Sequence, residues 1–221
     1  MEATDQIKVA EVSLRYGRCV ELVSLDPNFH DISVSLYEKD GVMTVWTFSK
    51  TPGVRDRIRT IRDQLISLGG LVPYGRTDDQ AQLPCGELHG RPMKFLMSLA
   101  VERPPDYVLP DKGVKDLRSS LMLGIDIEHS SGRWVYRVTA EGDAANRDAR
   151  LRAVTAGYVR YGEMEKVTET NLAFPCGYRH DELAMLVLPY ARNVSQVEDT
   201  IAAEALRGQM TTGTLGFTPP T

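Results

Sequence analysis

Apolar and polar residues alternate in two successive stretches of the first part of the chain. In one stretch Ile32, Val34 and Leu36 alternate with polar residues, and the next stretch, residues 42 to 49, contains valine, tryptophan and phenylalanine. A period of two is typical of a strand with one buried face, and the intervening Asp40-Gly41 is a hairpin signal. The pattern therefore predicts a two-stranded antiparallel hairpin.

The spacing of apolar residues then changes to that of a helix. Thr51-Pro52 supplies an N-cap and a proline suited to the first helical position, and Gly69-Gly70 closes the run. Four apolar residues between these ends recur at intervals of three or four: Val54, Ile58, Ile61 and Leu65. We expect a helix from Thr51 to Leu68 whose apolar stripe packs on a sheet.

Two further strands are predicted to complete this unit. Residues 71 to 75 form a short run with strand character, and residues 93 to 102 alternate. A polar loop between them ends in Pro84-Cys85-Gly86, where proline and glycine favour a turn. The unit from residue 30 to residue 103 is therefore predicted to be ββαββ.

A second unit, from residue 121 to residue 193, is predicted to follow the same order. Three alternating apolar residues precede Gly132 as their counterparts precede Gly41, at an offset of 91: Leu123, Ile125 and Ile127. Its helix is predicted over Asp143 to Ala156, with an apolar face made mostly of Ala145, Ala149 and Ala153 with the nearby Leu151 and Val154. Residues 157 to 162 resemble residues 70 to 75 at an offset of 87 and are expected to form the next strand.

A seven-residue motif that occurs twice is the clearest sign of internal duplication. Its copies are Leu83-Pro84-Cys85-Gly86-Glu87-Leu88-His89 and Phe174-Pro175-Cys176-Gly177-Tyr178-Arg179-His180, ninety-one residues apart. With average usage of glycine and proline and the few cysteines and histidines of this chain, four identities at one offset have a chance probability on the order of one in a million. We therefore interpret the chain as a duplicated one.

These observations predict an α+β fold: internally duplicated ββαββ units in a pseudo-two-fold arrangement of antiparallel sheets, with helices on one face. One helix cannot cover both faces of four strands, so the bare sheet face of each unit must be covered by the other copy or by another subunit. A capping box, Ser195-x-x-Glu198, predicts a further helix from Ser195 to Arg207. The expected organisation is a strand pair in 1–29, repeats in 30–103 and 121–193, a linker in 104–120, and a helix with a loose tail in 194–221.

Composition narrows the class of protein. The net charge of −4 argues against a non-specific nucleic-acid binder. The sequence contains neither an apolar run of 18 residues nor a secretory leader, so we expect no membrane span and no export. Three cysteines, two of them in the repeated motif, indicate reduced thiols in a cytoplasmic protein rather than a disulfide framework.

The repeated motif also supplies the candidate catalytic residues, Cys85 and His89 in one copy and Cys176 and His180 in the other. Residues four apart are about 6 Å apart in a helical turn but about 13 Å apart in a strand. Proline and glycine beside the cysteine favour the turn, in which the sulfur and the imidazole can make contact. A thiol beside an imidazole can be held as a thiolate, which is both a nucleophile and a metal ligand.

Three interpretations of the motif are open. It can be a structural corner with a small buried cysteine, which is the commonest role for such residues, or a thiol–imidazole active site in one or both copies. The third interpretation gathers both cysteines and both histidines into one Cys2His2 metal site. The spacing C-x3-H resembles half of a zinc site but lacks the usual C-x2-C partner, so the sequence alone assigns no metal and leaves the cofactor unknown.

Two other features of charged residues affect the choice of site. The acidic pair Asp181 and Glu182 follows the second motif and could orient His180, so the second copy is favoured if only one is active. Seven arginines lie on the two predicted helices: Arg55, Arg57, Arg59, Arg62, Arg147, Arg150 and Arg152. Aspartates are interspersed among them, so we expect a solvated, salt-bridged surface rather than an anion site.

Two classes of function remain open. The first is a small-molecule enzyme or binding protein with a pocket between the two repeats that uses a Cys/His pair. The alternative is a non-catalytic assembly or protein-interaction module built on a symmetric platform. A small-molecule ligand and a homo-oligomer are the partners that the sequence leaves open, and whether the chain is an enzyme is undecided.

Overall fold

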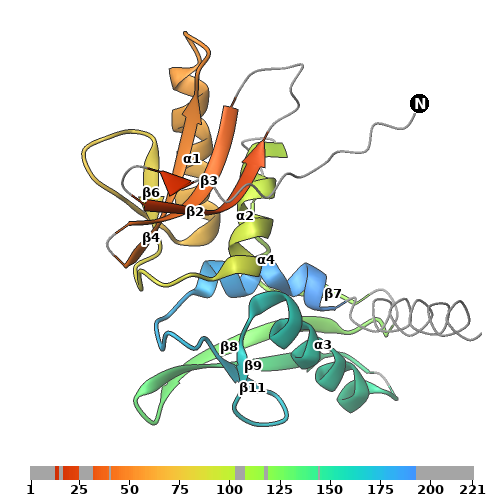
Figure 1. The fold of residues 1–221 in the computed structure, drawn as a ribbon. Helices are drawn as coiled ribbons and strands as arrows, with labels where there is room; N and C mark the ends of the chain where they lie inside the picture. The colour runs from red at the N-terminus through yellow and green to blue at the C-terminus, as the bar shows by residue number, and fades with distance from the viewer. Residues whose placement is uncertain are drawn as a thin grey trace, which may run out of the picture.

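A computed structural model describes residues 13–14, 17–24, 32–39, 41–102, 108–116, 119–143 and 145–192. These residues form a mixed α+β structure with two antiparallel sheets and four helices (Figure 1). We call residues 13–102 the first half and residues 108–192 the second half. The predicted helix from Ser195 to Arg207 and the tail after it lie outside the described residues. Within the described ranges, no helix has the length and apolar character needed to cross a membrane.

The first sheet has the strand order β1-β2-β3-β4-β6-β5. Its strands are β1 (Ser13–Leu14), β2 (Gly17–Ser24), β3 (Ile32–Lys39), β4 (Val42–Ser49), β5 (Val72–Pro73) and β6 (Gln80–Gln82). The predicted hairpin is confirmed as β3 and β4, which pair in register with Leu36 opposite Val45. The predicted N-terminal strand pair is present as β1 and β2.

Helix α1 (Arg55–Gly69) contains three of the four residues of the predicted apolar stripe; Val54 stands just before it, and Ile58 is only half-buried. Ile61 and Leu65 are buried, and Gly70 ends the helix in the left-handed conformation with φ of 64°. The helix begins at Arg55 rather than at Thr51, because residues 51 to 53 form a turn in which Gly53 has a positive φ of 84°. The start of the helix was therefore predicted four residues too early.

Residues 93 to 102, predicted as the last strand of the first unit, belong to helix α2 (Gly90–Glu102) instead. Five buried residues follow the helical spacing i, i+3, i+4, i+7 and i+8: Met93, Leu96, Met97, Ala100 and Val101. Pro92 lies in the first turn, where the missing N–H costs no helical hydrogen bond. The strand prediction was wrong because a short, largely apolar segment fits both periods.

The second sheet has the strand order β10-β11-β9-β8-β7. Its strands are β7 (Val114–Lys115), β8 (Met122–Ser130), β9 (Arg133–Glu141), β10 (Glu165–Lys166) and β11 (Asn171–Ala173). Ser131 and Gly132 join β8 to β9 with φ of 52° and 79°, as a tight hairpin turn with two left-handed residues requires. Leu123 and Tyr136 face the core, whereas Glu128 and Arg137 form an ion pair of 3.0 Å on the opposite, exposed face.

Helix α3 (Arg147–Gly162) begins four residues later and ends six residues later than predicted. Ala145 and Ala149 are exposed, so the predicted alanine face is wrong. The buried residues of the helix are instead Arg150, Val154, Thr155, Gly157, Tyr158 and Gly162. Residues 157 to 162 are therefore helical and do not correspond to residues 70 to 75, which follow a helix.

Helix α4 (Asp181–Ala191) takes the place of the last strand predicted for the second unit. With this change both halves have the order ββαββα for the elements β3-β4-α1-β5-β6-α2 and β8-β9-α3-β10-β11-α4. Apart from β1, the two sheets also share one strand order. The predicted unit ββαββ therefore had a strand where each half has its final helix, and it omitted β6 in the first half and β10 and β11 in the second.

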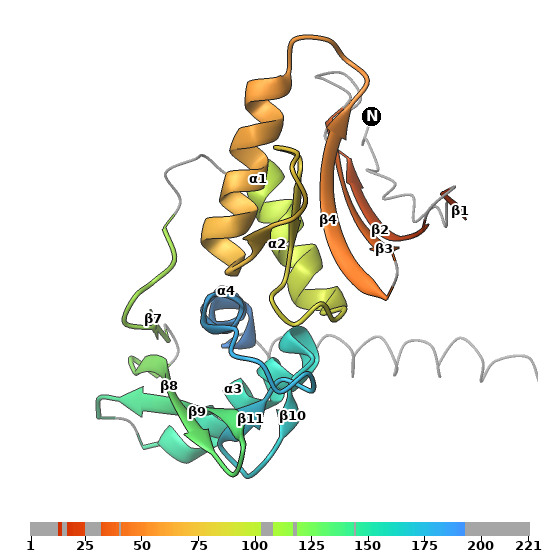
Figure 2. The ribbon, with the colours of Figure 1, turned by 90° about the vertical axis from the view of Figure 1, so that its left-hand side faces the viewer.

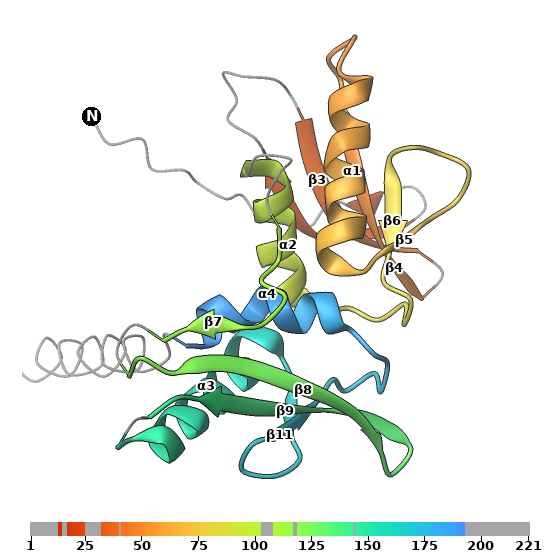
Figure 3. The ribbon, with the colours of Figure 1, turned by 180° about the vertical axis from the view of Figure 1, so that it is seen from behind.

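The four helices gather between the two sheets. Helix α4 contacts α1, α2, α3 and β8, and it lies between the first-half helices and the second sheet (Figures 1 and 2). The view from behind shows α4 crossing above β8 and β9 and below α1 and α2 (Figure 3). The two sheets are separate, and helices lie between them. If the other copy covered the bare sheet face of each unit directly, the two sheets would instead be joined or packed face to face. Buried apolar residues from both halves form one core.

Candidate metal centre

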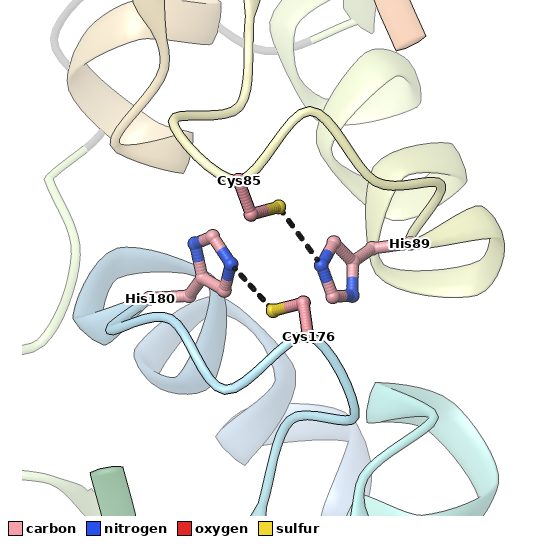
Figure 4. Close-up of side chains that lie close together, drawn as sticks. All are labelled: Cys85, His89, Cys176 and His180. Atoms are coloured by element: carbon pink, nitrogen blue, oxygen red, sulfur yellow. Dashed lines mark hydrogen bonds between the residues drawn. The ribbon is translucent and has the colours of Figure 1, made fainter. Parts of the chain in front are cut away.

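The two copies of the repeated motif lie opposite each other where the halves meet (Figure 4). The first connects β6 to α2, and the second connects β11 to α4. Because α2 and α4 pack against each other, the loops at their N-terminal ends are brought together. The convergence therefore depends on the helices that the sequence did not predict.

Each cysteine occupies the same position in a tight turn. The backbone N–H of Gly86 donates to the carbonyl of Leu83 at 3.0 Å, and Gly177 donates to Phe174 at the same distance. The two glycines have φ of 73° and 72°, which a residue without a side chain adopts without strain. Proline at the second position of each turn presets the backbone for this conformation.

Each histidine stands immediately before a helix. The carbonyl of His89 accepts the N–H of Met93 at 2.8 Å, and the carbonyl of His180 accepts the N–H of Ala184 at 3.0 Å. The cysteine and histidine side chains of each motif point toward each other (Figure 4). The sulfur–imidazole contact expected from the spacing is present in both copies, at 3.4 Å for Cys85 and 3.3 Å for Cys176 from Sγ to Nε2.

The two pairs form a single cluster of four. One ligand atom from each of Cys85, His89, Cys176 and His180 lies within 4.8 Å of every other (Figure 4). In a tetrahedral zinc site, with bonds of about 2.3 Å to sulfur and about 2.0 Å to nitrogen, these atoms would be about 3.3 to 3.8 Å apart. The observed sulfur–nitrogen contacts already have this length, and the longest separation needs a contraction of at most about 1.5 Å to match it.

The histidines are the more deeply buried members of the cluster. His89 and His180 are 3% and 2% exposed, whereas the two cysteines are half-buried. The ring of Phe174 lies edge-on to both imidazoles, at 5.3 Å from His89 and 5.1 Å from His180. Aromatic packing of this kind fixes the ring orientations before any ligand binds.

Burial also determines the charge of these groups. It lowers the pKa of His89 to about 4 and, together with the nearby His89, lowers that of His180 to about 4. Burial and the neighbouring Cys176 raise the pKa of the Cys85 thiol to about 12. Both imidazoles are therefore neutral at pH 7, in the state that binds a metal, and a thiolate at Cys85 would require a nearby cation.

The acidic pair after the second motif does not orient His180. The carboxylate of Asp181 accepts two hydrogen bonds of 2.8 Å from Nε of Arg179, and that of Glu182 lies beside Gly70 in the first half. The backbone N–H of His180 donates instead to the hydroxyl of Tyr136 on β9, at 2.5 Å. Sequence reasoning missed Tyr136, which carries no local signal because it lies 44 residues from His180.

Three of the seven arginines, Arg55, Arg59 and Arg62, form ion pairs on α1, which is part of the salt-bridged surface that the sequence predicts. Arg55 and Arg59 both pair with Asp78, at 3.3 and 3.1 Å. Arg150 is the exception: it is buried and pairs with the buried Asp116 at 2.6 Å. This pair ties the segment before β8 to α3, so the role of Arg150 is structural rather than that of a surface cation.

A small pocket lies beside the cluster at the boundary between the halves. It has a volume of about 270 Å³ and is lined by Glu87, Leu88, His89, Glu163, Pro175 and Cys176. The pocket reaches the sulfur-bearing residue of the second motif and the histidine of the first. A small molecule therefore has access to one cysteine of the cluster.

No protein-family model matches the chain, and comparison with curated proteins and with solved structures gives no match. The case for a function therefore comes from the geometry of the cluster.

Proposed function

We propose that Cys85, His89, Cys176 and His180 together bind one zinc ion, and that this ion fastens the two halves of the chain to each other. The observation that carries the proposal is the approach of all four ligand atoms to within 4.8 Å, with two ligands from each half. In this proposal the chain is a zinc-stabilised duplicated protein in which each unit supplies one C-x3-H half-site, related by a pseudo-two-fold axis.

The donor set favours zinc over other common metals. Two thiolates and two imidazoles in a compact arrangement suit a tetrahedral ion of intermediate softness, whereas magnesium and calcium prefer oxygen ligands. The backbone N–H of Glu87 contacts the sulfur of Cys85 at 3.4 Å, a contact that stabilises negative charge on a bound thiolate.

The same donor set favours a structural role over a catalytic one. A catalytic zinc keeps a coordination position for water or substrate, whereas here the protein supplies all four ligands. This supports the non-catalytic alternative, an assembly module whose two halves are held in a fixed relation.

One observation favours a second candidate, a thiol–imidazole enzyme that uses Cys176 and His180 or Cys85 and His89. The pocket of about 270 Å³ reaches Cys176, and a nucleophilic sulfur needs such access. The two candidates predict different rates of thiol alkylation. In a structural site, bound zinc would occupy the sulfurs and block alkylation, whereas an active thiol would alkylate rapidly at pH 7 without metal.

The deciding experiment is metal analysis of the full chain purified without a chelator and then titrated with zinc and cobalt. We expect about one ion per chain. We also expect the strong visible absorption and the sulfur-to-metal charge-transfer band of tetrahedral cobalt with thiolate ligands. Removal of the ion should lower the melting temperature, and added zinc should restore it.

Cys19→Ser is the matched control for this experiment, because Cys19 is the only cysteine outside the repeated motif. It should leave the stoichiometry and the cobalt spectrum unchanged. A chain that binds no metal, or binds cobalt without the thiolate band, would overturn the zinc proposal. Rapid alkylation of Cys176 in such a chain would support the enzyme instead.

A further inference from the structure

The two sulfurs of the cluster come from opposite halves and are the accessible part of it. Cys85 and Cys176 are half-buried, their Sγ atoms lie within 4.8 Å of each other, and the pocket at the boundary reaches Cys176. The histidines beside them are almost fully buried. An oxidant in this pocket therefore meets Cys176 and His89, which both line it, and of these two groups the thiol is the one that a peroxide oxidises.

We propose that Cys85 and Cys176 form an oxidative modification site, in which a peroxide converts the two thiols into a disulfide across the boundary between the halves. The release of metal that would accompany this step rests on the proposed zinc site. The disulfide itself requires only the two sulfurs and a peroxide.

The chemistry proceeds in two steps with a balanced exchange of atoms. The deprotonated sulfur of Cys176 attacks one oxygen of hydrogen peroxide, so that an S–O bond forms, the O–O bond breaks, and hydroxide leaves and is protonated to water. The sulfur of Cys85 then attacks this sulfenic sulfur while its proton passes to the departing hydroxide, so that the S–S bond forms, the S–O bond breaks and a second water leaves. The thiols lose two electrons and two protons, and the peroxide becomes two waters.

The local backbone leaves room for the sulfurs to approach each other. A disulfide needs a sulfur–sulfur distance of about 2.05 Å, so each turn must shift by roughly 1 Å or more. The glycine after each cysteine lies in open space: no atom lies within 4 Å of a Cβ built on Gly177, and for Gly86 only Val42 does, at 3.9 Å. The side toward which a Cβ on each glycine would point is therefore open, while the hydrogen bond of 3.0 Å from the N–H of Met43 to the carbonyl of Gly86 still holds the first turn to β4.

Oxidation would change the cluster from four ligands to two. A disulfide sulfur carries no negative charge and is a poor zinc ligand, so only His89 and His180 would remain. Two imidazoles hold zinc far less firmly than the complete set. The expected result is that one equivalent of peroxide releases the ion while the covalent bond keeps the halves together.

The experiment uses the full chain with Cys19→Ser, both zinc-loaded and metal-free, treated with increasing hydrogen peroxide. Intact mass, peptide mapping without reductant, and zinc release to a chromogenic chelator are measured together. We expect a loss of about 2 Da, a Cys85–Cys176 cross-linked peptide and about one zinc released per chain. Dithiothreitol should reverse all three changes.

Single substitutions separate the two steps. With Cys85→Ser the reaction should stop at a sulfenic acid on Cys176, trapped by dimedone as an added mass, and no loss of 2 Da should occur. Metal-free protein that gains oxygen at Cys176 without forming the cross-link would overturn the proposal. A chain that binds no zinc but forms the cross-link would overturn the zinc site and support the modification site, so the two failures are distinguishable.

Discussion

The two motif loops have nearly the same backbone but different surroundings. Both turns close with a 3.0 Å hydrogen bond, both glycines are left-handed, and in both copies the proline is exposed, the cysteine half-buried and the histidine buried. The side chains between glycine and histidine are exposed in both and differ completely, Glu87-Leu88 against Tyr178-Arg179. The common residues are those that the cluster needs, and the exposed positions between them are free to vary.

The loops are anchored to their sheets by different bonds. In the first half the backbone N–H of Met43 donates to the carbonyl of Gly86 at 3.0 Å. In the second half the hydroxyl of Tyr136 accepts the N–H of His180. Phe174 belongs to the second half but packs on both histidines. The second half therefore supplies more of the support for a site to which both halves contribute equally.

The largest effect should come from removing either cysteine. If one ion binds all four ligands, then Cys85→Ser and Cys176→Ser should weaken zinc binding to a similar extent. Structural zinc sites bind with about 10 to 16 kcal/mol, so one of four ligands corresponds to about 3 to 4 kcal/mol, or a few hundredfold in affinity. Competition with a chelator of known affinity measures this loss.

Two independent thiol sites would respond differently. Each single substitution would then remove about half of the reactive thiol and leave the other copy unchanged. Such a result would contradict the shared site, while Cys19→Ser again serves as the unaffected control.

The next largest effect concerns the helices that support the loops. Ile61 in α1 and Val154 in α3 are both fully buried, and each lies nine residues before the left-handed residue that ends its helix. Ile61→Ala should lower the free energy of unfolding by about 2 to 4 kcal/mol, and Val154→Ala, which removes fewer atoms, by about 1 to 3. Denaturant unfolding measures both.

Arg59→Ala is the control on the exposed side of α1, where the guanidinium pairs with Asp78 in solvent. It should leave the unfolding midpoint close to that of the unmodified chain. Equal losses for Arg59→Ala and Ile61→Ala would mean that the faces of α1 are wrongly assigned.

The sequence predicted those elements whose apolar residues show a clear period. In β3 the apolar Ile32, Val34 and Leu36 alternate with polar residues, although the other face of the hairpin is also largely buried, as at Ser35 and Thr44. The stripe on α1 arises because one face of the helix meets the core and the other meets solvent. Helix α4 lacks this contrast, because it lies between other helices and a sheet, and six of its eleven residues are buried: Leu183, Ala184, Leu186, Val187, Leu188 and Ala191. A segment that is apolar nearly all round gives no period, so strand and helix could not be distinguished.

The sequence predicted the contact within each Cys/His pair, but it offered the gathering of both pairs into one site only as one of three interpretations. The spacing of four and the proline and glycine indicate a turn in which sulfur and imidazole meet, and this depends on residues within one motif. The convergence of the pairs depends on how α2 and α4 pack. The hydrogen bond between His180 and Tyr136 likewise joins the residue before α4 to a strand 44 residues away in the sequence. The duplication of C-x3-H was the available signal, because two half-sites make the donor set of one zinc ion.

A smaller effect is expected from Tyr136→Phe, which removes the anchor specific to the second loop. The buried N–H of His180 would lose its acceptor, at a cost of about 1 to 3 kcal/mol in unfolding free energy. As an outer partner of a metal ligand, the hydroxyl should also contribute about tenfold or more to zinc affinity. Calorimetric unfolding and the chelator competition measure the two quantities.

Tyr158→Phe is a matched control for this change. Its buried hydroxyl donates to the carbonyl of Ala184 in α4 at 2.9 Å, so the variant also loses a buried hydrogen bond near the start of that helix. It should lower stability by about 1 kcal/mol and leave zinc affinity unchanged. If both variants weaken zinc binding equally, then Tyr136 acts through general stability and not by holding His180.

The smallest predicted effect concerns the ends of the two corresponding helices. Gly70 ends α1 and Glu163 ends α3, both left-handed, with φ of 64° and 53°. A left-handed conformation costs a residue with a side chain about 1 to 2 kcal/mol, which Glu163→Gly would remove. The greater freedom of glycine in the unfolded chain and loss of the half-exposed ion pair with Arg91, 3.7 Å long, offset part of this gain.

We therefore expect Glu163→Gly to raise the free energy of unfolding by about 0.5 kcal/mol, and Gly70→Ala to lower it by about 1 kcal/mol or more. The larger loss at Gly70 is expected because a Cβ there would lie 2.5 Å from Oε2 of Glu182 and displace that side chain. If Glu163→Gly destabilises the protein instead, then the contact of Glu163 with Arg91 across the boundary between the halves contributes more than the backbone conformation costs.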